Sequence, residues 1–270
     1  MELEVLKYPA QNSKAANPPV LCVHGMWHGA WCWQPYFMPS WSELGYDCYA
    51  MSLSNHGQSA RRKAFNRLRI RDYMDDVKQV IEQIGQPPVI IAHSMGGFII
   101  QKLLEFDEVS VSGVVLLGSV PPFGVLRPTL TVLSDYPATF LRANLTFNLK
   151  CIVDTPERFR RIFFSDQVPE SQVQDALKKI NTESYLAYLD MLFQPVRRNN
   201  IHTPLLVLGG EKDHVIPPDL VKRTAAYYGV DPILFPGMGH NLMLEPQYQL
   251  VVEHIDGWIR ELAPSQAHLD

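Results

Sequence analysis

The sequence lacks the marks of a disulfide-stapled, zinc-binding or membrane-spanning protein. Its 270 residues include only four cysteines, Cys22, Cys32, Cys48 and Cys151, and no C-x-x-C pair. We therefore expect reduced thiols, with neither disulfides nor zinc ligands. No apolar run reaches the roughly 18 residues of a spanning helix. A basic segment followed by an apolar one is missing near residue 1, so we expect no secretory signal and a cytoplasmic protein.

A strong charge of one sign and the common nucleotide-binding motifs are also missing. The formal net charge of −4 gives no general attraction to nucleic acid or to a membrane surface. The chain has no G-x-x-x-x-G-K-[ST] loop, no G-x-G-x-x-G after a strand and no H-E-x-x-H. We expect no cofactor, no metal and no nucleic-acid partner. The oligomeric state stays open.

What the chain does have is a regular alternation of short apolar runs and amphipathic stretches. Hydrophobic residues make up 46% of the sequence, enough for a large core. The alternation predicts an α/β fold, with a mostly parallel central sheet and helices on both faces. The expected strands are 3–8, 19–24, 47–52, 88–93, 112–118, 204–209 and 231–235. The expected helices are 30–43, 70–84, 95–106, 217–228 and 245–262.

The interval from about 120 to 202 interrupts this rhythm. A plain crossover between neighbouring parallel strands needs far fewer residues. The interval contains helical patterns, notably from Ser171 to Phe193, and many large apolar residues. We predict a helical cap at 120–202, inserted between two parts of the core at 1–119 and 203–270. Most of its apolar residues are expected to pack the cap onto the core, and the others to line a hydrophobic pocket.

Ser94 is the candidate nucleophile. Residues 89–98 read VIIAHSMGGF, an apolar strand that stops at a serine and continues at once as a helix. A nucleophile on such a sharp turn needs small neighbours, and Ala92 and Gly96 supply them two residues before and after. The backbone N–H of Met95, at a helix N-terminus, can then face a developing oxyanion.

An acid and a histidine follow in the order that a serine nucleophile requires. Asp213 comes just after the expected strand 204–209, and His240 comes just after strand 231–235. His240 is the candidate base, and Asp213 would orient it. Glu211 is the second choice for the acid and Asp231 another rival. Asp213 as a mere helix N-cap is the alternative interpretation.

The end of the strand 19–24 supplies a second candidate oxyanion donor. It reads His24-Gly25-Met26, in which Gly25 allows close approach and the N–H of Met26 would pair with that of Met95. His24 is expected to support this loop through hydrogen bonds. The segment 54–59, SNHGQS, is expected to brace it.

Residues 24–33, HGMWHGAWCW, resemble the HGxxHGAWxW segment of the methylesterase and hydroxynitrile lyase branch of the α/β-hydrolase superfamily. The order Ser…Asp…His also resembles that superfamily, over about residues 19 to 262. Hydroxynitrile lyases of the branch carry threonine at the position of Gly25 and lysine at that of Asn241. Both departures favour ester hydrolysis, and a serine nucleophile disfavours dehalogenase and epoxide hydrolase activities.

The resemblance and the residues together imply a cofactor-free serine carboxylesterase acting on a small ester with an apolar part. Gly25, Trp27 and His28 are candidate pocket residues beside the oxyanion loop. Two alternatives stay open: a lyase or C–C bond hydrolase with the same triad, and a ligand receptor with this fold and no significant turnover.

Overall fold

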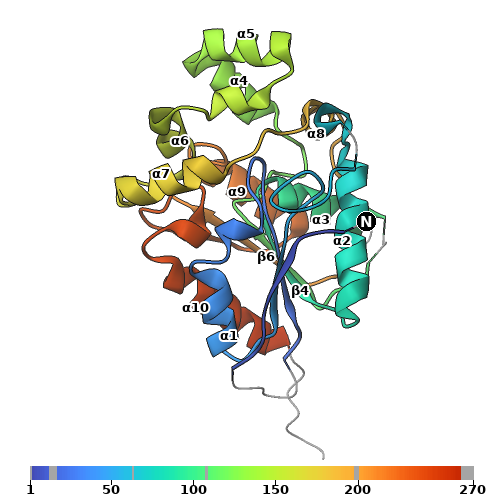
Figure 1. Cartoon of the computed structure of the whole chain (residues 1–270). Coiled ribbons are helices and arrows are strands. Elements are labelled where there is room, and N and C mark those ends of the chain that lie inside the picture. Colours follow the sequence, from blue (N-terminus) through green and yellow to red (C-terminus); the bar gives the residue numbers. More distant parts are fainter. Residues whose placement is uncertain (1, 12–16, 63, 107–108, 198–200, 263–270) are drawn as a thin grey trace, which may run out of the picture.

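The computed structural model describes residues 2–11, 17–62, 64–106, 109–197 and 201–262, and its strands form one sheet (Figure 1). The order is β1-β3-β2-β4-β5-β6-β7, in which β1 pairs antiparallel with β3 and all other pairs are parallel. The strands are β1 Val5–Tyr8, β2 Val20–Val23, β3 Cys48–Met51, β4 Val89–His93, β5 Gly113–Leu117, β6 Leu205–Gly210 and β7 Pro232–Phe235. The predicted α/β fold with a mostly parallel sheet is confirmed, and each observed strand overlaps an expected one.

Helices cover both faces of the sheet and bury its strands completely at the centre. Every residue of β2, β4 and β5 is buried, which explains their continuous apolar sequences. On one face lie α1 (Phe37–Glu43) and α10 (Tyr248–Leu262); on the other lie α2 (Ile70–Ile84), α3 (Met95–Glu105) and α9 (Pro218–Tyr228). Alternate residues of each strand therefore enter two separate cores.

The carboxyl ends of the parallel strands meet at one edge, the upper edge in Figure 1. The chain leaves β2 at His24, β4 at Ser94, β6 at Glu211 and β7 at Pro236. After β2 the chain continues to β3, and after β4 it continues to β5, which lies in the opposite direction along the strand order. Ligands of open α/β sheets bind in the crevice at such a switch point, here between β2 and β4.

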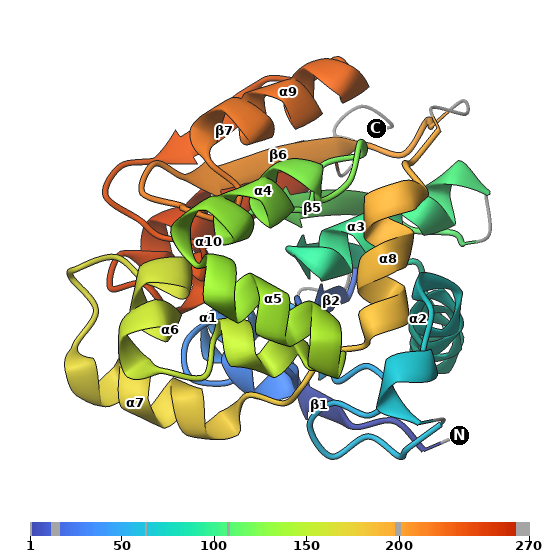
Figure 2. The same cartoon turned by 90° about the horizontal axis from the view of Figure 1, so that it is seen from above.

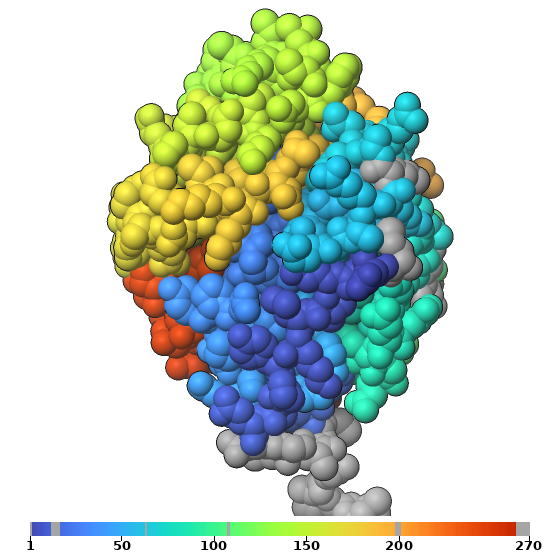
Figure 3. Space-filling model, in the orientation of Figure 1, coloured from blue at the N-terminus to red at the C-terminus, as the bar shows by residue number. Residues whose placement is uncertain are grey.

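The helices between β5 and β6 form a separate layer above this edge, which we call the helical insertion (Figures 1 and 2). It comprises α4 (Leu126–Asp135), α5 (Pro137–Thr146), the 3₁₀ turn η3 (Leu149–Ile152), α6 (Pro156–Phe163), α7 (Glu170–Lys179) and α8 (Tyr185–Phe193). In the space-filling view it makes up the green and yellow upper part of the molecule (Figure 3). Its two ends are joined, since the N–H of Val196 donates to the carbonyl of Pro122 at 2.7 Å.

One expected helix and the helical pattern of the insertion are each divided in the structure. The stretch 30–43 forms a 3₁₀ turn, η1 (Ala30–Cys32), and then α1, because Pro35 between them has no N–H to donate. The pattern from Ser171 to Phe193 forms α7 and α8. Ile180 and Ser184 are extended there, and the Ser184 side chain caps α8 at the N–H of Ala187.

The four cysteines are free and buried, in agreement with the expected reduced thiols. Within the described ranges no helix combines the length and apolar character that crossing a bilayer requires.

Candidate active site

Ser94 occupies the sharp turn between β4 and α3 in a strained conformation. Its φ of 52° and ψ of −118° are rarely adopted by residues other than glycine. Its backbone is held by hydrogen bonds, since its N–H donates to Leu117 and its carbonyl accepts from Val120. A side chain at Gly96 would begin 2.6 Å from the carbonyl oxygen of His24, and one at Gly25 would begin 2.7 Å from Cβ of Ser94. The neighbouring glycines are therefore a steric requirement of this turn.

His240 and Asp213 are in direct contact, although 27 positions separate them in the chain. The Nδ1 of His240 lies 2.7 Å from Oδ2 of Asp213, and both side chains are buried. The other oxygen, Oδ1, accepts from the N–H groups of Val215 and Ile216 at 2.7 and 2.8 Å. A carboxylate at this position accepts a hydrogen bond from Nδ1–H, which leaves Nε2 of His240 free to accept a proton. Asp213 accepts these bonds from the turn before α9, whereas the N-cap of α9 is Pro217 and has no side-chain cap, so the interpretation of Asp213 as a helix N-cap was wrong.

A second histidine supports the loop that carries His240. His93 directly precedes Ser94, and its Nε2 lies 3.0 Å from the carbonyl oxygen of His240. Burial lowers the pKa of His93 well below its usual value, and the nearby His240 adds to this. His93 is therefore a neutral ring that donates through Nε2.

Buried histidines also fix both peptide groups that flank Met26. The carbonyl of Gly25, which shares a peptide plane with the N–H of Met26, accepts from Nδ1 of His24 at 2.8 Å. The carbonyl of Met26 accepts from Nδ1 of His28 at 2.7 Å. Burial lowers the pKa of His24 well below its usual value and that of His28 to about 4, so both rings are neutral single donors.

Each ring accepts a hydrogen bond on its other nitrogen. The N–H of Leu53 donates to Nε2 of His24 at 3.0 Å, and the amide of Asn241 donates to Nε2 of His28 at 3.0 Å. These partners fix the tautomers, and with them the direction of the Met26 N–H. The N–H of Met95 belongs to the first turn of α3, where helical N–H groups have no partner within the helix.

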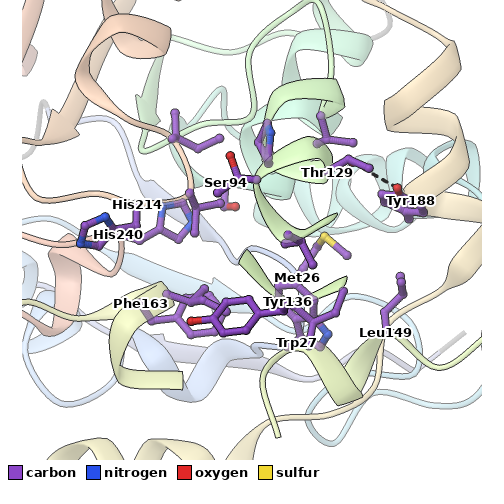
Figure 4. Close-up of a pocket in the computed structure, with 18 of the residues that line it drawn as sticks. Met26, Trp27, Ser94, Thr129, Tyr136, Leu149, Phe163, Tyr188, His214 and His240 are labelled. Carbon is purple, nitrogen blue, oxygen red and sulfur yellow. Dashed lines mark hydrogen bonds between the residues drawn. The ribbon is translucent and has the colours of Figure 1, made fainter. Parts of the chain in front are cut away.

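One largely apolar cavity joins the sheet edge to the helical insertion (Figure 4). Ser94 and His240 line it together with Met26, Trp27 and His93, and the close-up shows His240 to one side of Ser94 and Leu149 to the other. The other apolar residues of its wall include Val120, Val125, Val132, Phe140, Leu149, Ile152, Ile162 and Phe163. Some polar residues of the wall are paired with one another: the hydroxyls of Thr129 and Tyr188 form a hydrogen bond of 3.1 Å, and Arg161 and Asp135 form an ion pair at 3.1 Å.

The predicted site residues divide into those at the cavity and those behind it. Trp27 lines the cavity, as expected, and its ring lies edge-on to Phe163. His28 is completely buried and is absent from the cavity wall, so the interpretation of His28 as a pocket residue was wrong: hydrogen bonds on both ring nitrogens turn it inward. Gly25 likewise lies against Ser94 and His93 and not in the wall. His214, which sequence reasoning missed, lines the cavity directly after Asp213.

Among the residues that the structure describes, no three His, Cys, Asp or Glu side chains gather in a way that could hold a metal ion.

A family model described as the alpha/beta hydrolase family matches residues 20–253. The chain belongs to this family. The hydrolase YugF of Bacillus subtilis, which is described as uncharacterized, is 25% identical over 262 residues, 89% of each chain. Methylesterase 3 of Arabidopsis thaliana is 25% identical over 105 residues, 38% of this chain and 40% of its own. An esterase from Exiguobacterium antarcticum superposes with a TM-score of 0.76 at 20% identity, covering 96% of this chain and 95% of its own.

These comparisons confirm the resemblance noted in the sequence. The alpha/beta hydrolase match spans both parts of the sheet, and the relatives include hydrolases and a methylesterase. They support hydrolase activity for this alpha/beta hydrolase, whereas the solved esterase structure, at 20% identity, shows the fold alone.

Proposed function

We propose that the protein is a serine hydrolase that cleaves a carboxylic ester through an acyl-enzyme, without a cofactor. The observation that carries this proposal is the shared cavity of Ser94 and His240, with His240 held by Asp213 at 2.7 Å. A strained serine at a sheet edge, a histidine beside it and a buried acid make up a nucleophile, a base and an orienting group.

In the first half of the proposed reaction, Oγ of Ser94 attacks the ester carbonyl while Nε2 of His240 takes the hydroxyl proton. The carbonyl oxygen becomes an oxyanion, which accepts hydrogen bonds from the N–H groups of Met26 and Met95. The C–O bond then breaks, and His240 returns the proton to the leaving alcohol. In the second half, His240 takes a proton from water, the hydroxide attacks the acyl-enzyme, and the acid leaves as Ser94 regains its proton.

The cavity wall supports a substrate with an apolar part. Its apolar residues come mainly from the helical insertion, which acts in this proposal as a cap over the sheet edge. An apolar acyl chain or alcohol displaces water from such a wall at a gain of roughly 25 cal/mol per Å² of buried apolar surface.

Two features of the site favour hydrolysis over cyanohydrin cleavage. A side chain at residue 25 would begin 2.7 Å from Cβ of Ser94, which leaves no room for threonine on this backbone. Asn241 stands where lyases of the resembling branch carry lysine, and its amide is committed to His28.

The test is hydrolysis of p-nitrophenyl esters from acetate to palmitate by the wild-type protein and by Ser94→Ala. We expect turnover that disappears in Ser94→Ala, together with covalent labelling of Ser94 by a fluorophosphonate. Labelling without turnover on any ester would replace this proposal with a C–C bond hydrolase. Tight ligand binding with neither labelling nor turnover would replace it with a receptor.

A further inference from the structure

A buried carboxylate of the helical insertion reaches the loop that carries Met26. Glu183 lies between α7 and α8 and is completely inaccessible to solvent. Its Oε2 accepts from the N–H of Trp27 at 3.2 Å and lies 3.0 Å from Nε2 of His56. Its Oε1 accepts from the hydroxyl of Tyr73 at 3.0 Å and from the N–H of Ser184 at 2.8 Å. A buried carboxylate is expensive unless it is paired in this way, and each oxygen here has two partners.

His56 links Glu183 to the segment 54–59. Its Nε2 lies 3.0 Å from Oε2 of Glu183, and its Nδ1 lies 3.1 Å from the carbonyl oxygen of Ser54. Burial and the charge of Glu183 raise the pKa of Tyr73 well above its usual value, so the Tyr73 hydroxyl keeps its proton and donates. The segment 54–59 thus braces the oxyanion loop through a residue of the insertion.

Glu183 and its neighbours hold the peptide group between Met26 and Trp27 from both sides. The carbonyl of Met26 accepts from His28, and the N–H of Trp27 donates to Glu183. The carbonyl of Trp27 accepts from the N–H of Asn181 at 2.9 Å. Trp27 has a φ of 64°, a left-handed conformation that a bulky residue adopts only when its surroundings enforce it.

We propose that Glu183 is a positioning residue for the oxyanion hole. It fixes the Met26–Trp27 peptide group, and through it the direction in which Met26 presents its N–H to the oxyanion. Glu183 does not line the cavity and touches no reacting atom. The effect of Glu183 on turnover rests on the proposed function, whereas its effect on the conformation of the loop does not.

Asp190 offers a matched control in the same insertion. It is also buried, and it joins α8 to the start of α2 by contacts with the guanidinium of Arg69 and the N–H of Ile70. Asp190→Asn therefore weakens the attachment of the insertion without touching the oxyanion loop. Comparison with this variant distinguishes a specific effect of Glu183 on the oxyanion loop from a general effect of attaching the insertion to the core.

The experiment compares Glu183→Gln with Asp190→Asn at a temperature well below both melting temperatures. An amide in place of the Glu183 carboxylate keeps the volume but has one acceptor oxygen. One of the two N–H groups, Trp27 or Ser184, must then face an NH₂ group. We expect Glu183→Gln to lower kcat on p-nitrophenyl esters about tenfold with KM within about twofold. Loss of a whole oxyanion donor costs roughly 10²–10³, and a misdirected donor costs less.

The second measurement is amide hydrogen exchange at Met26 and Trp27, which does not depend on turnover. We expect exchange at these amides to rise at least about tenfold in Glu183→Gln and to stay at the wild-type rate in Asp190→Asn. If Glu183→Gln does not fold, Tyr73→Phe removes one donor to Glu183 and should show both changes with smaller amplitude.

Glu183→Leu has no acceptor for the Trp27 N–H in any orientation, so unchanged exchange at Trp27 in both Glu183→Gln and Glu183→Leu would overturn the inference, and so would an equal loss of kcat in Asp190→Asn. Faster exchange at Trp27 in a protein with no Ser94-dependent turnover would support the positioning role while the proposed function fails.

Discussion

The tautomer of His240 can be reversed by exchanging one atom of Asp213. In Asp213→Asn, the N–H groups of Val215 and Ile216 both point at the position of Oδ1, so they retain the amide oxygen there. The amide NH₂ must then occupy the position of Oδ2, 2.7 Å from Nδ1 of His240. Because an NH₂ group only donates, Nδ1 has to accept, and the proton of the ring moves to Nε2.

An imidazole with its proton on Nε2 cannot take a proton from Ser94. A wrong-tautomer histidine lowers kcat in serine proteases by about 10⁴-fold, which corresponds to about 5.5 kcal/mol of transition-state stabilisation. We expect Asp213→Asn to lower kcat on p-nitrophenyl butyrate by this order, with KM nearly unchanged. The contacts of Oδ1 are kept, so the melting temperature should change little.

Steady-state kinetics with calorimetry on the same samples checks this expectation, with Asp190→Asn as the control for the same substitution at another buried site. A kcat within tenfold of wild type in a folded Asp213→Asn protein would refute the assignment of Asp213 as the orienting acid. Glu211, the second choice from the sequence, would then be the next residue to change.

Three further predictions concern the loop, the buried histidines and the cavity. Gly25→Ala places Cβ 2.7 Å from Cβ of Ser94 and 3.0 Å from Nδ1 of His93. We therefore expect kcat/KM on p-nitrophenyl esters to fall at least about 100-fold. A variant with nearly wild-type activity would show that the loop can move to make room for the methyl group. The folded-state pKa of His28 is about 4, below the usual 6.5, so its contribution to stability is complete above pH 6.5 and is lost as the pH falls towards 4. Urea unfolding should show a loss of about 3 kcal/mol in the free energy of unfolding, to which the buried His24 and His93 should add losses of the same sign. An equally steep pH dependence of stability in a folded His28→Gln variant would contradict this role of His28. Val132→Trp narrows the cavity, so kcat/KM for octanoate should fall at least about tenfold relative to acetate, and an unchanged chain-length profile would place the acyl chain elsewhere.

The sheet was predictable because its signal is local. Strands such as β4 and β5 are buried on both faces, and their unbroken apolar runs stand out from the amphipathic helices between them. Ser94, Asp213 and His240 were predicted as a site for a related reason: each lies in the connection that follows a strand, and carboxyl ends of parallel strands share one edge.

The residues that sequence reasoning misplaced or missed depend on contacts between distant segments. His28 resembles a pocket residue beside Trp27, and only its bond to Asn241, 213 positions later, explains why it turns inward. Glu183 carries no local mark, since its partners Trp27, His56 and Tyr73 lie more than 100 positions away. The break between α7 and α8 was hidden because both halves are helical in pattern; Ser184, which caps α8, is a residue type that would have marked the start of a second helix.

The closed ends of the helical insertion bear on how this protein could be re-engineered. Because β5 and β6 are hydrogen-bonded neighbours and Val196 pairs with Pro122, the sheet would close in the same way around an insertion of different length or sequence. A chimera could therefore exchange the whole module for that of a relative while keeping Ser94, Asp213 and His240. Such an exchange also removes the acceptor for the Trp27 N–H, so a graft transfers turnover together with selectivity only if the incoming module brings a carboxylate to that peptide group.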